Sequence, residues 1–240
     1  IDIMLAVDVS TSMLAEDLKP NRLEAAKDVA AEFINGRPND NIGITLFAGE
    51  SFTQCPLTVD HAVLLDMIHN IKCGLIEDGT AVGMGIANAV TRLKDSKAKS
   101  KVIILLTDGN NNKGDISPMT AAEIAKSFGI RVYTIGVGTN GMAPYPYPVG
   151  NTVQYVSMPV EIDEKTLTQI AGTTDGNYFR ATSNSKLKEV YEEIDKLEKT
   201  KLNVKEYSKR DEEYHWFALA AFLCVLLEVL LRNSILKKIP

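Results

Sequence analysis

Short, nearly unbroken apolar runs alternate along the chain with segments of helical periodicity. The runs are rich in Val, Ile and Leu and lie at 3–7, 42–48, 102–106 and 130–137. Runs of this length and composition are typical of parallel strands that are covered on both faces. The segments between them repeat apolar residues every three or four positions, as amphipathic helices do. The pattern therefore predicts an α/β fold with a doubly wound, mostly parallel sheet and helices on both of its faces.

Polar residues that can cap a helix mark where the predicted helices begin. Six helices are expected to start at or just after Asn21, Asp60, Thr80, Ser117, Asp163 and Asn184. The last of them is expected to end near Lys199. One connection breaks the alternation, because only Gly49 and Glu50 separate the run 42–48 from the strand-like residues 51–55. Such a two-residue link predicts a hairpin, and hence one short antiparallel edge strand.

A second kind of apolar segment lies at 216–231, where Glu228 is the one charge among sixteen residues. Sixteen helical residues span about 24 Å, less than the roughly 30 Å of a bilayer core, so flanking residues are needed for a membrane span. A buried core helix is the alternative. The expected organisation is a folded domain at 1–200, a charged neck at 201–213, a transmembrane helix at 214–236 and a basic tail at 237–240.

Charge and cysteine content narrow the class of protein. A net charge of −5 over 240 residues argues against a nucleic-acid-binding protein, which normally presents a basic face. The three cysteines, Cys55, Cys73 and Cys224, have no metal-ligand spacing. Cys55 and Cys73 could pair if the domain faces an oxidising compartment. Because residue 1 is not Met and opens directly on a strand-like run, further residues are expected before it.

Side chains with oxygen donors follow two predicted strands and precede one predicted helix. They are Asp8, Ser10 and Ser12 after the first strand, Thr80 before the third helix, and Asp108 after the third apolar run. Ligands bind beyond the carboxyl ends of the strands in such sheets, so these side chains should gather at one edge. Each residue alone could simply form a turn or a cap. Together, with no His or Cys among them, they predict a site for Mg²⁺, Mn²⁺ or Ca²⁺ rather than Zn²⁺.

These residues, with the turn Thr107-Asp108-Gly109, resemble the metal-ion-dependent adhesion site of von Willebrand factor A domains, and all five motif positions match. The resemblance covers roughly residues 1–200 and implies the corresponding fold. It also implies that Ser10, Ser12 and Thr80 ligate the ion, whereas Asp8 and Asp108 act largely through water. An acidic residue of a partner protein fills the open coordination position in that family, so such a partner is expected here.

A narrower resemblance lies in three stretches, 3–12, 46–58 and 77–83, together with the apolar segment after the domain. They resemble bacterial Bat aerotolerance-type membrane proteins, the BatA type above all. That resemblance implies partners among sister von Willebrand A proteins and MoxR-type AAA+ ATPases. It also implies a domain on the periplasmic side of the inner membrane. Counting basic residues alone would favour a cytoplasmic domain, but long domains translocate largely regardless of charge, so the resemblance decides our expectation.

Two other classes of function compete with a binding module. A Mg²⁺-dependent phosphohydrolase of the aspartyl-phosphate type would need a second aspartate two positions after Asp8, where this chain has Ser10. The other alternative is a structural scaffold whose metal site stays empty. None of the three histidines, His61, His69 and His215, has a visible nucleophile, so no catalytic residue is assigned. We therefore expect a binding protein rather than an enzyme.

A long connection at 139–162 separates a predicted strand from a predicted helix. It contains Pro144, Pro146 and Pro148 interleaved with Tyr145 and Tyr147. Structureless loops of this length are uncommon and are often functional. The segment leaves the sheet at the end that carries the metal motif. It is therefore either a plain surface loop or small hairpin, or a rim that contacts the partner.

Overall fold

The computed structural model describes residues 1–207 except 110, 140 and 151, and beyond them the single residues 219, 221, 225, 228, 229 and 231. Ile1–Lys199 form one compact unit and Thr200–Pro240 a second. Among the described residues, no helix is long and apolar enough to cross a membrane. The expected transmembrane helix at 214–236 lies, apart from those single residues, outside the described part of the chain, so it stays a prediction.

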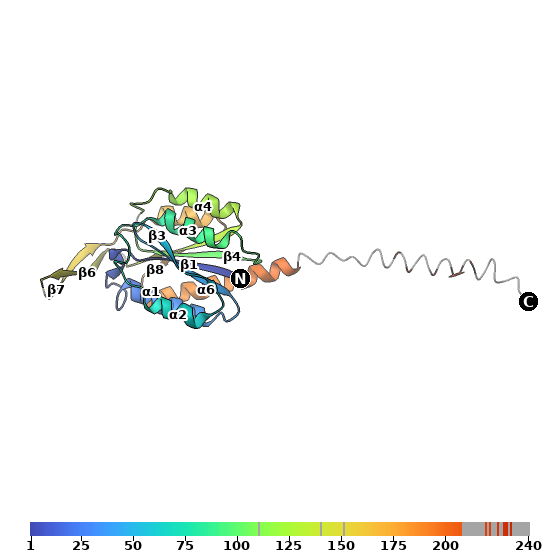
Figure 1. Cartoon of the computed structure of the whole chain (residues 1–240), viewed down its shortest axis with the longest axis horizontal. Coiled ribbons are helices and arrows are strands. Elements are labelled where there is room, and N and C mark those ends of the chain that lie inside the picture. The colour runs from blue at the N-terminus through green and yellow to red at the C-terminus, as the bar shows by residue number, and fades with distance from the viewer. Residues whose placement is uncertain are drawn as a thin grey trace, which may run out of the picture. The chain divides into compact units, whose positions relative to one another are not determined.

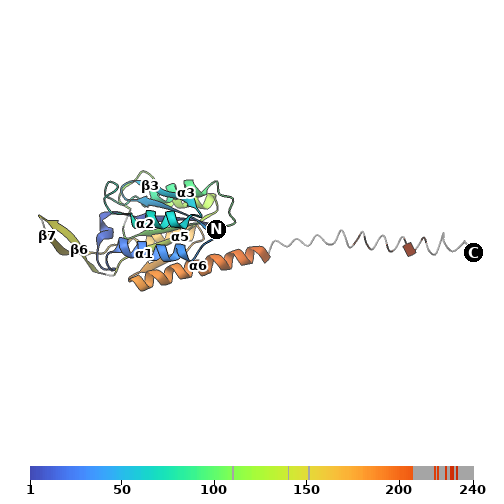
Figure 2. The same ribbon diagram turned by 60° about the horizontal axis from the view of Figure 1, so that its bottom comes forward.

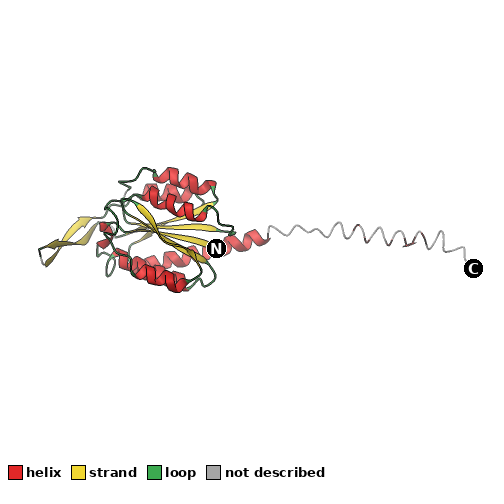
Figure 3. Cartoon of the chain, viewed as in Figure 1, coloured by secondary structure: helices red, strands yellow, loops and turns green. Residues whose placement is uncertain are grey.

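Six strands form the central sheet in the order β3-β2-β1-β4-β5-β8. Figure 3 shows this sheet between helices. They are β1 (Asp2–Asp8), β2 (Asn41–Phe47), β3 (Ser51–Thr58), β4 (Lys101–Thr107), β5 (Ile130–Val137) and β8 (Tyr178–Ala181). Strand β3 pairs antiparallel with β2 at one edge, and every other neighbouring pair is parallel. The predicted parallel sheet and its antiparallel edge strand are confirmed.

Helices cover both faces of the sheet (Figures 1 and 2). One face carries α1 (Arg22–Asn35), α2 (His61–His69) and α6 (Asn184–Tyr207), and the other carries α3 (Val82–Leu93), α4 (Pro118–Ser127) and α5 (Glu164–Thr173). Side chains alternate along a strand. Ile3, Leu5 and Val7 of β1 therefore join the first core, and Met4 and Ala6 join the second. Burial on both faces explains why this strand is an unbroken apolar run.

Capping hydrogen bonds confirm four of the predicted helix starts. The side-chain oxygens of Asn21, Asp60, Ser117 and Asp163 each accept a bond from a backbone N–H of the first turn. The third helix differs, because Ala81 occupies its N-cap position without a side-chain hydrogen bond. Helix α6 runs on to Tyr207 instead of ending near Lys199. Residues 200–207 contain no Gly or Pro that would stop it, so the first part of the predicted neck is helical.

Buried ionic contacts fasten α6 to the sheet. The Glu198 side chain, 1% exposed, accepts hydrogen bonds from the Tyr133 hydroxyl over 2.6 Å and from Arg131 Nη2 over 2.7 Å. The Ser100 hydroxyl donates a third over 2.8 Å. Because a buried carboxylate needs such partners, these bonds hold α6 against the sheet at Glu198.

The long connection at 139–162 contains a hairpin. Strand β6 (Met142–Val149) pairs antiparallel with β7 (Thr152–Pro159) in a separate two-stranded sheet. The hairpin projects from the body of the domain (Figure 1). The small hairpin was one of the alternatives that the sequence left open. Cys55 and Cys73 are both free, so the disulfide considered from the sequence is not formed.

Candidate metal centre

The end of β1 places a fully buried carboxylate at the carboxyl edge of the sheet. Asp8 is the last residue of β1 and is 0% exposed. Its Oδ1 accepts a hydrogen bond from the N–H of Ser10 over 2.9 Å, and its Oδ2 accepts one from the Thr107 hydroxyl over 2.6 Å. Thr107 ends β4, the parallel neighbour of β1. Two adjacent strands therefore hold this carboxylate.

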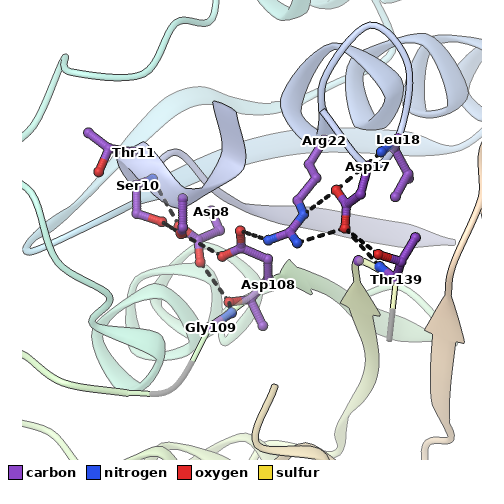
Figure 4. Close-up of polar contacts among 12 residues, drawn as sticks. Asp8, Ser10, Thr11, Asp17, Leu18, Arg22, Asp108, Gly109 and Thr139 are labelled. Atoms are coloured by element: carbon purple, nitrogen blue, oxygen red, sulfur yellow. Dashed lines mark hydrogen bonds and ion pairs between the residues drawn. The ribbon is translucent and has the colours of Figure 1, made fainter. Parts of the chain in front are cut away.

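Hydroxyl groups connect the loop after β1 with the loop after β4. Ser10 Oγ lies 2.9 Å from Ser12 Oγ, and the Ser12 hydroxyl donates to Asp108 Oδ1 over 2.7 Å. Asp108 is 3% exposed. Figure 4 shows Asp8, Ser10 and Asp108 turned toward one another. Four of the five predicted residues thus meet at one edge of the sheet.

Thr80 approaches the same cluster from the loop before α3. A Cβ atom built on Gly109 would lie 3.4 Å from Thr80 Oγ1, so this hydroxyl lies beside the Asp108-Gly109 turn. The backbone N–H of Thr80 donates to Asn112 Oδ1 over 2.9 Å. No hydrogen bond of the Thr80 hydroxyl is found within the described ranges. The fifth predicted residue therefore joins the other four with its oxygen uncommitted.

Burial makes the charged form of Asp8 unfavourable. Loss of water, and then the neighbouring Asp108 carboxylate, raise the pKa of Asp8 to about 7. Burial also raises the pKa of Asp108, although the nearby Arg22 opposes that rise. A bound divalent ion would be the largest local charge and would reverse this effect. The donor set of hydroxyls and carboxylates fits a hard cation.

A buried arginine holds the far side of Asp108. Arg22 Nη1 donates to Asp108 Oδ2 over 2.6 Å, and Arg22 Nε and Nη2 donate to the two oxygens of Asp17, each over 2.7 Å (Figure 4). Asp17 also accepts bonds from the N–H and hydroxyl of Thr139, just before the hairpin. Sequence reasoning missed Arg22 because a charged residue in the first turn of an amphipathic helix is normally solvated.

A cavity of about 270 Å³ lies between Ser12, one of the five candidate ligands, and the hairpin. Its lining includes Thr11, Ser12 and Arg22 on the domain and Tyr145, Tyr147 and Met158 on the hairpin. A larger cavity of about 390 Å³ between α1 and α6 contains none of the five predicted residues. Charged side chains of its lining form ion pairs, as Arg37 Nη2 does with Asp195 Oδ1 at 2.6 Å and Lys188 does with Glu32 at 2.8 Å. The smaller cavity is therefore the one that adjoins the candidate chemistry.

Comparison with known families covers most of the folded unit. Residues 2–193 match the family model of the von Willebrand factor type A domain. An uncharacterised protein of Borreliella burgdorferi is 28% identical over 240 residues, and a UPF0353 protein of Mycolicibacterium paratuberculosis is 33% identical over 205 residues. These matches cover 99% and 79% of this chain but 70% and 58% of the relatives. The chain thus spans only part of the length of those proteins.

Solved structures from Bacteroides resemble the chain over nearly their whole length. BatB from Bacteroides thetaiotaomicron is 33% identical with a TM-score of 0.73, covering 83% of this chain and 99% of that one. An aerotolerance-related membrane protein from Bacteroides fragilis is also 33% identical, with a TM-score of 0.70, covering 82% and 99%. The predicted relation to Bat aerotolerance-type proteins is confirmed.

A third structure bears on the choice of metal. Proximal thread matrix protein 1 of the mussel byssus is 25% identical with a TM-score of 0.63, covering 82% of this chain and 45% of that one. It has been solved with zinc in its metal-ion-dependent adhesion site motif. Zinc can therefore occupy the motif in that protein, whereas the expectation of Mg²⁺, Mn²⁺ or Ca²⁺ for this chain stays a prediction.

Proposed function

The chain belongs to the von Willebrand factor type A domain family, and we propose that it is a binding module that grips a partner protein through a divalent cation. Ser10, Ser12 and Thr80 would ligate the ion, and Asp8 and Asp108 would act largely through water. An acidic residue of the partner would complete the coordination. The ion supplies positive charge at the edge of the sheet, and the side chains of this domain position it.

The unequal surroundings of the two buried carboxylates carry this proposal. Asp108 has Arg22 as a counter-charge. Among the described residues, Asp8 receives hydrogen bonds from the neutral groups of Ser10 and Thr107. A buried carboxylate without a cation is costly, and a bound metal ion would remove that cost. The uncommitted hydroxyl of Thr80 points to the same conclusion, because it is a ready ligand.

Magnesium is the ion that we propose, with Mn²⁺ or Ca²⁺ as alternatives. Mg²⁺ is commonly bound by few protein oxygens and keeps several waters, which suits a site that also leaves a position for a partner. The zinc-containing relative makes Zn²⁺ a competitor that binding experiments should include.

Ser10 favours binding over hydrolysis. In a phosphohydrolase of the aspartyl-phosphate type, the residue at this position is a carboxylic acid that exchanges a proton with the substrate. A serine hydroxyl does not ionise at neutral pH, and the Ser10 hydroxyl is shared with Ser12. The proposed role is therefore adhesion without a chemical step.

The hairpin would form the rim of the partner site. Tyr145 and Tyr147 line the cavity whose opposite wall contains Ser12. A partner segment that brings a carboxylate to the ion would place its neighbouring residues against these rings. Tyrosine contributes a large contact area at low cost in conformational entropy, so both rings should add to the binding energy.

We further propose that the chain acts in a Bat-type assembly at the bacterial inner membrane. The similarity to BatB and to an aerotolerance-related membrane protein supports this location. Its partners would be sister von Willebrand A proteins and a MoxR-type AAA+ ATPase, in an envelope stress or aerotolerance pathway. The 214–236 helix would contact lipid, with the domain on the periplasmic side.

Affinity capture from bacterial membranes tests the proposal. The full chain and its Asp66→Asn variant, which changes an exposed carboxylate on α2, should retain a partner in Mg²⁺ and release it in EDTA. Asp8→Asn should retain none, because the site would lose its ion. Capture that is indifferent to both EDTA and Asp8→Asn would contradict a metal-dependent role.

The rim is tested separately by replacing Tyr145 and Tyr147 with Ala in one variant. That variant should bind Mg²⁺ like the parent chain but retain much less partner. Normal capture would show that the hairpin is not part of this binding surface.

A further inference from the structure

The two outer edges of the β6–β7 hairpin are unequal. Val149 and Thr152 flank a two-residue turn and form its closing, hydrogen-bonded pair. Counting back along β6, Pro144, Pro146 and Pro148 all fall at pairs that exchange no hydrogen bonds. Their nitrogens therefore face outward, where proline is tolerated because no donor is needed. Without these donors, the outer edge of β6 cannot pair with another strand.

The outer edge of β7 has a proline only at its last residue, Pro159, and is not blocked before it. Val153, Tyr155 and Ser157 lie opposite the three prolines, so their N–H and C=O groups also face away from the hairpin. None of these groups has a backbone partner among the described residues. The side chains of Val153 and Tyr155 are 58% and 59% exposed. β7 therefore presents three consecutive outward donor–acceptor positions to the solvent.

The hairpin lacks the charged residues that usually keep an exposed strand edge from pairing with another chain. Residues 139–160 contain no charged side chain. The large exposed apolar side chains on the two strands are Met142, Tyr147, Val149, Val153, Tyr155, Val156 and Met158. Natural proteins block exposed edges with charge, proline or a bulge. In this hairpin, three prolines block the outer edge of β6, whereas the outer edge of β7 stays free for pairing and carries exposed apolar side chains.

We propose that β7 pairs antiparallel with β7 of a second copy of this chain. A two-fold axis at Tyr155 would place it opposite Tyr155 of the second copy, and Val153 opposite Ser157 of the second copy. This register uses every outward donor and acceptor of Val153, Tyr155 and Ser157. A symmetric interface requires that the surface complement itself. The side chains of the strand itself are uncharged and meet that requirement. Glu16, whose Oε1 accepts a hydrogen bond from the Tyr155 hydroxyl over 2.8 Å, forms an ion pair with Lys19 of its own copy over 3.3 Å.

The prolines also explain why the pairing would stop at two copies. In the combined four-stranded ribbon, both outer edges belong to β6 and are blocked. Growth into a fibre, the hazard of an open apolar edge, is therefore prevented. One short strand from each copy makes a small contact, so the dimer should be weak, with a dissociation constant in the micromolar range.

Proline substitution at the open edge tests the pairing. In Ser157→Pro, the lost N–H is one that faces outward, so the hairpin's own ladder is kept. The new spacing with Pro159 matches the alternate prolines of β6. The matched control is Ser157→Ala, which retains the N–H. Hydrogen exchange at the inward amides of Tyr145 and Tyr147 reports whether the hairpin itself remains intact.

The measurement is the mass of the full chain by light scattering in a non-ionic detergent, from about 1 to about 500 µM, a range that brackets a weak interface. The parent chain and Ser157→Ala should move from monomer to dimer, equally in Mg²⁺ and in EDTA. Ser157→Pro should stay monomeric. A parent chain that is monomeric throughout, or a Ser157→Pro variant that still dimerises, would overturn the proposal. If the parent chain is monomeric throughout, the outer edge of β7 would instead be available to pair with a strand of another protein.

Cross-linking tests the register. Cα atoms of a hydrogen-bonded antiparallel pair lie about 5.5 Å apart, within the range of a disulfide. Oxidised Tyr155→Cys should therefore form a covalent dimer across the two-fold axis. Ser157→Cys, whose copies would face Val153 instead, should not. Equal cross-linking by both variants would contradict this register.

Discussion

Asp8 and Asp108 lie at the ends of adjacent strands, but their neighbours differ. Arg22 balances the charge of Asp108 and, through Asp17, reaches Thr139 at the base of the hairpin. Asp8 has no such cation among the described residues and instead accepts hydrogen bonds from the Thr107 hydroxyl and the Ser10 N–H. At the scale of single residues, the proposed metal site therefore depends on one carboxylate that has no counter-ion among the described residues.

Asp8 should make the metal-free domain less stable as the pH rises. Its pKa is about 7 in the folded domain against an ordinary value of 3.8, so the folded state holds a proton that the unfolded state releases. The free energy of unfolding in EDTA should therefore fall between about pH 4 and pH 7, by a few kcal/mol. Asp8→Asn should flatten this dependence, and saturating Mg²⁺ should reduce it in the parent chain. Parallel urea-unfolding curves for parent and variant across this pH range would refute the assignment.

Arg22 should be among the residues most sensitive to substitution. Arg22→Met would leave Asp17 and Asp108 buried without their cation. The expected loss in the free energy of unfolding is about 3–5 kcal/mol, measured by urea titration. Arg92→Gln is the control, because Arg92 is exposed and donates to Thr53, and it should change stability by less than about 0.5 kcal/mol. Similar effects of the two substitutions would show that the buried ion pairs contribute little.

Some residues of the candidate site could be predicted from the sequence, and others became apparent only in the structure. The five residues with side-chain oxygens were predictable because each lies at or shortly after the end of a strand, or shortly before a helix, where the sheet topology brings loops together. Arg22 was not, since its role depends on Asp17 and Asp108, which approach it only in the folded chain. Thr80 was predicted as a ligand. That its hydroxyl does not cap α3 became clear only from the structure, in which Ala81 occupies the N-cap position.

At the scale of elements, α3 is placed by a close contact with the chain before α4. A Cβ atom added at Gly83 would lie 2.0 Å from the Ile116 carbonyl oxygen, so no larger residue fits without moving backbone. The same glycine lies one turn from Thr80, so the contact helps to position a proposed ligand.

Gly83→Ala should therefore destabilise the domain by about 2 kcal/mol or more, although alanine ordinarily favours a helix. It should also weaken metal binding by shifting the start of α3. Gly172→Ala in α5 is the matched control, because nothing lies within 4 Å of its added Cβ atom, and it should be neutral or stabilising by up to about 1 kcal/mol. Thermal unfolding of both variants checks this, and equal melting temperatures would contradict the contact argument.

Elements were predictable from sequence where periodicity was long and caps were clear. β8 was missed because its four residues include Arg180 and three of them are only partly buried, too short and polar for the apolar-run pattern. The hairpin strands were left open because their prolines argue against a strand unless each nitrogen faces outward, which depends on the register. The end of α6 was placed too early because no residue there stops a helix.

At the scale of the whole molecule, orientation across the membrane is the main proposal that labelling can test. Gln154→Cys on the exposed hairpin should react with a membrane-impermeant maleimide in bacteria whose outer membrane has been permeabilised. The two native thiols of the folded domain give little background, because Cys55 is buried and burial raises the pKa of Cys73 to about 12. Cys224 is replaced by Ser in both the parent and the variant. Labelling that requires lysis of the inner membrane would place the domain in the cytoplasm.

Calorimetric titration of the full chain with Mg²⁺ and Mn²⁺ tests the central claim of a metal-dependent binding module. The parent chain and the exposed-site control Asp66→Asn should each bind one ion. Asp8→Asn should bind it at least 10–100-fold more weakly while keeping the parent's circular dichroism spectrum. An Asp8→Asn variant that is folded and binds the ion with unchanged affinity would contradict the assignment of the site.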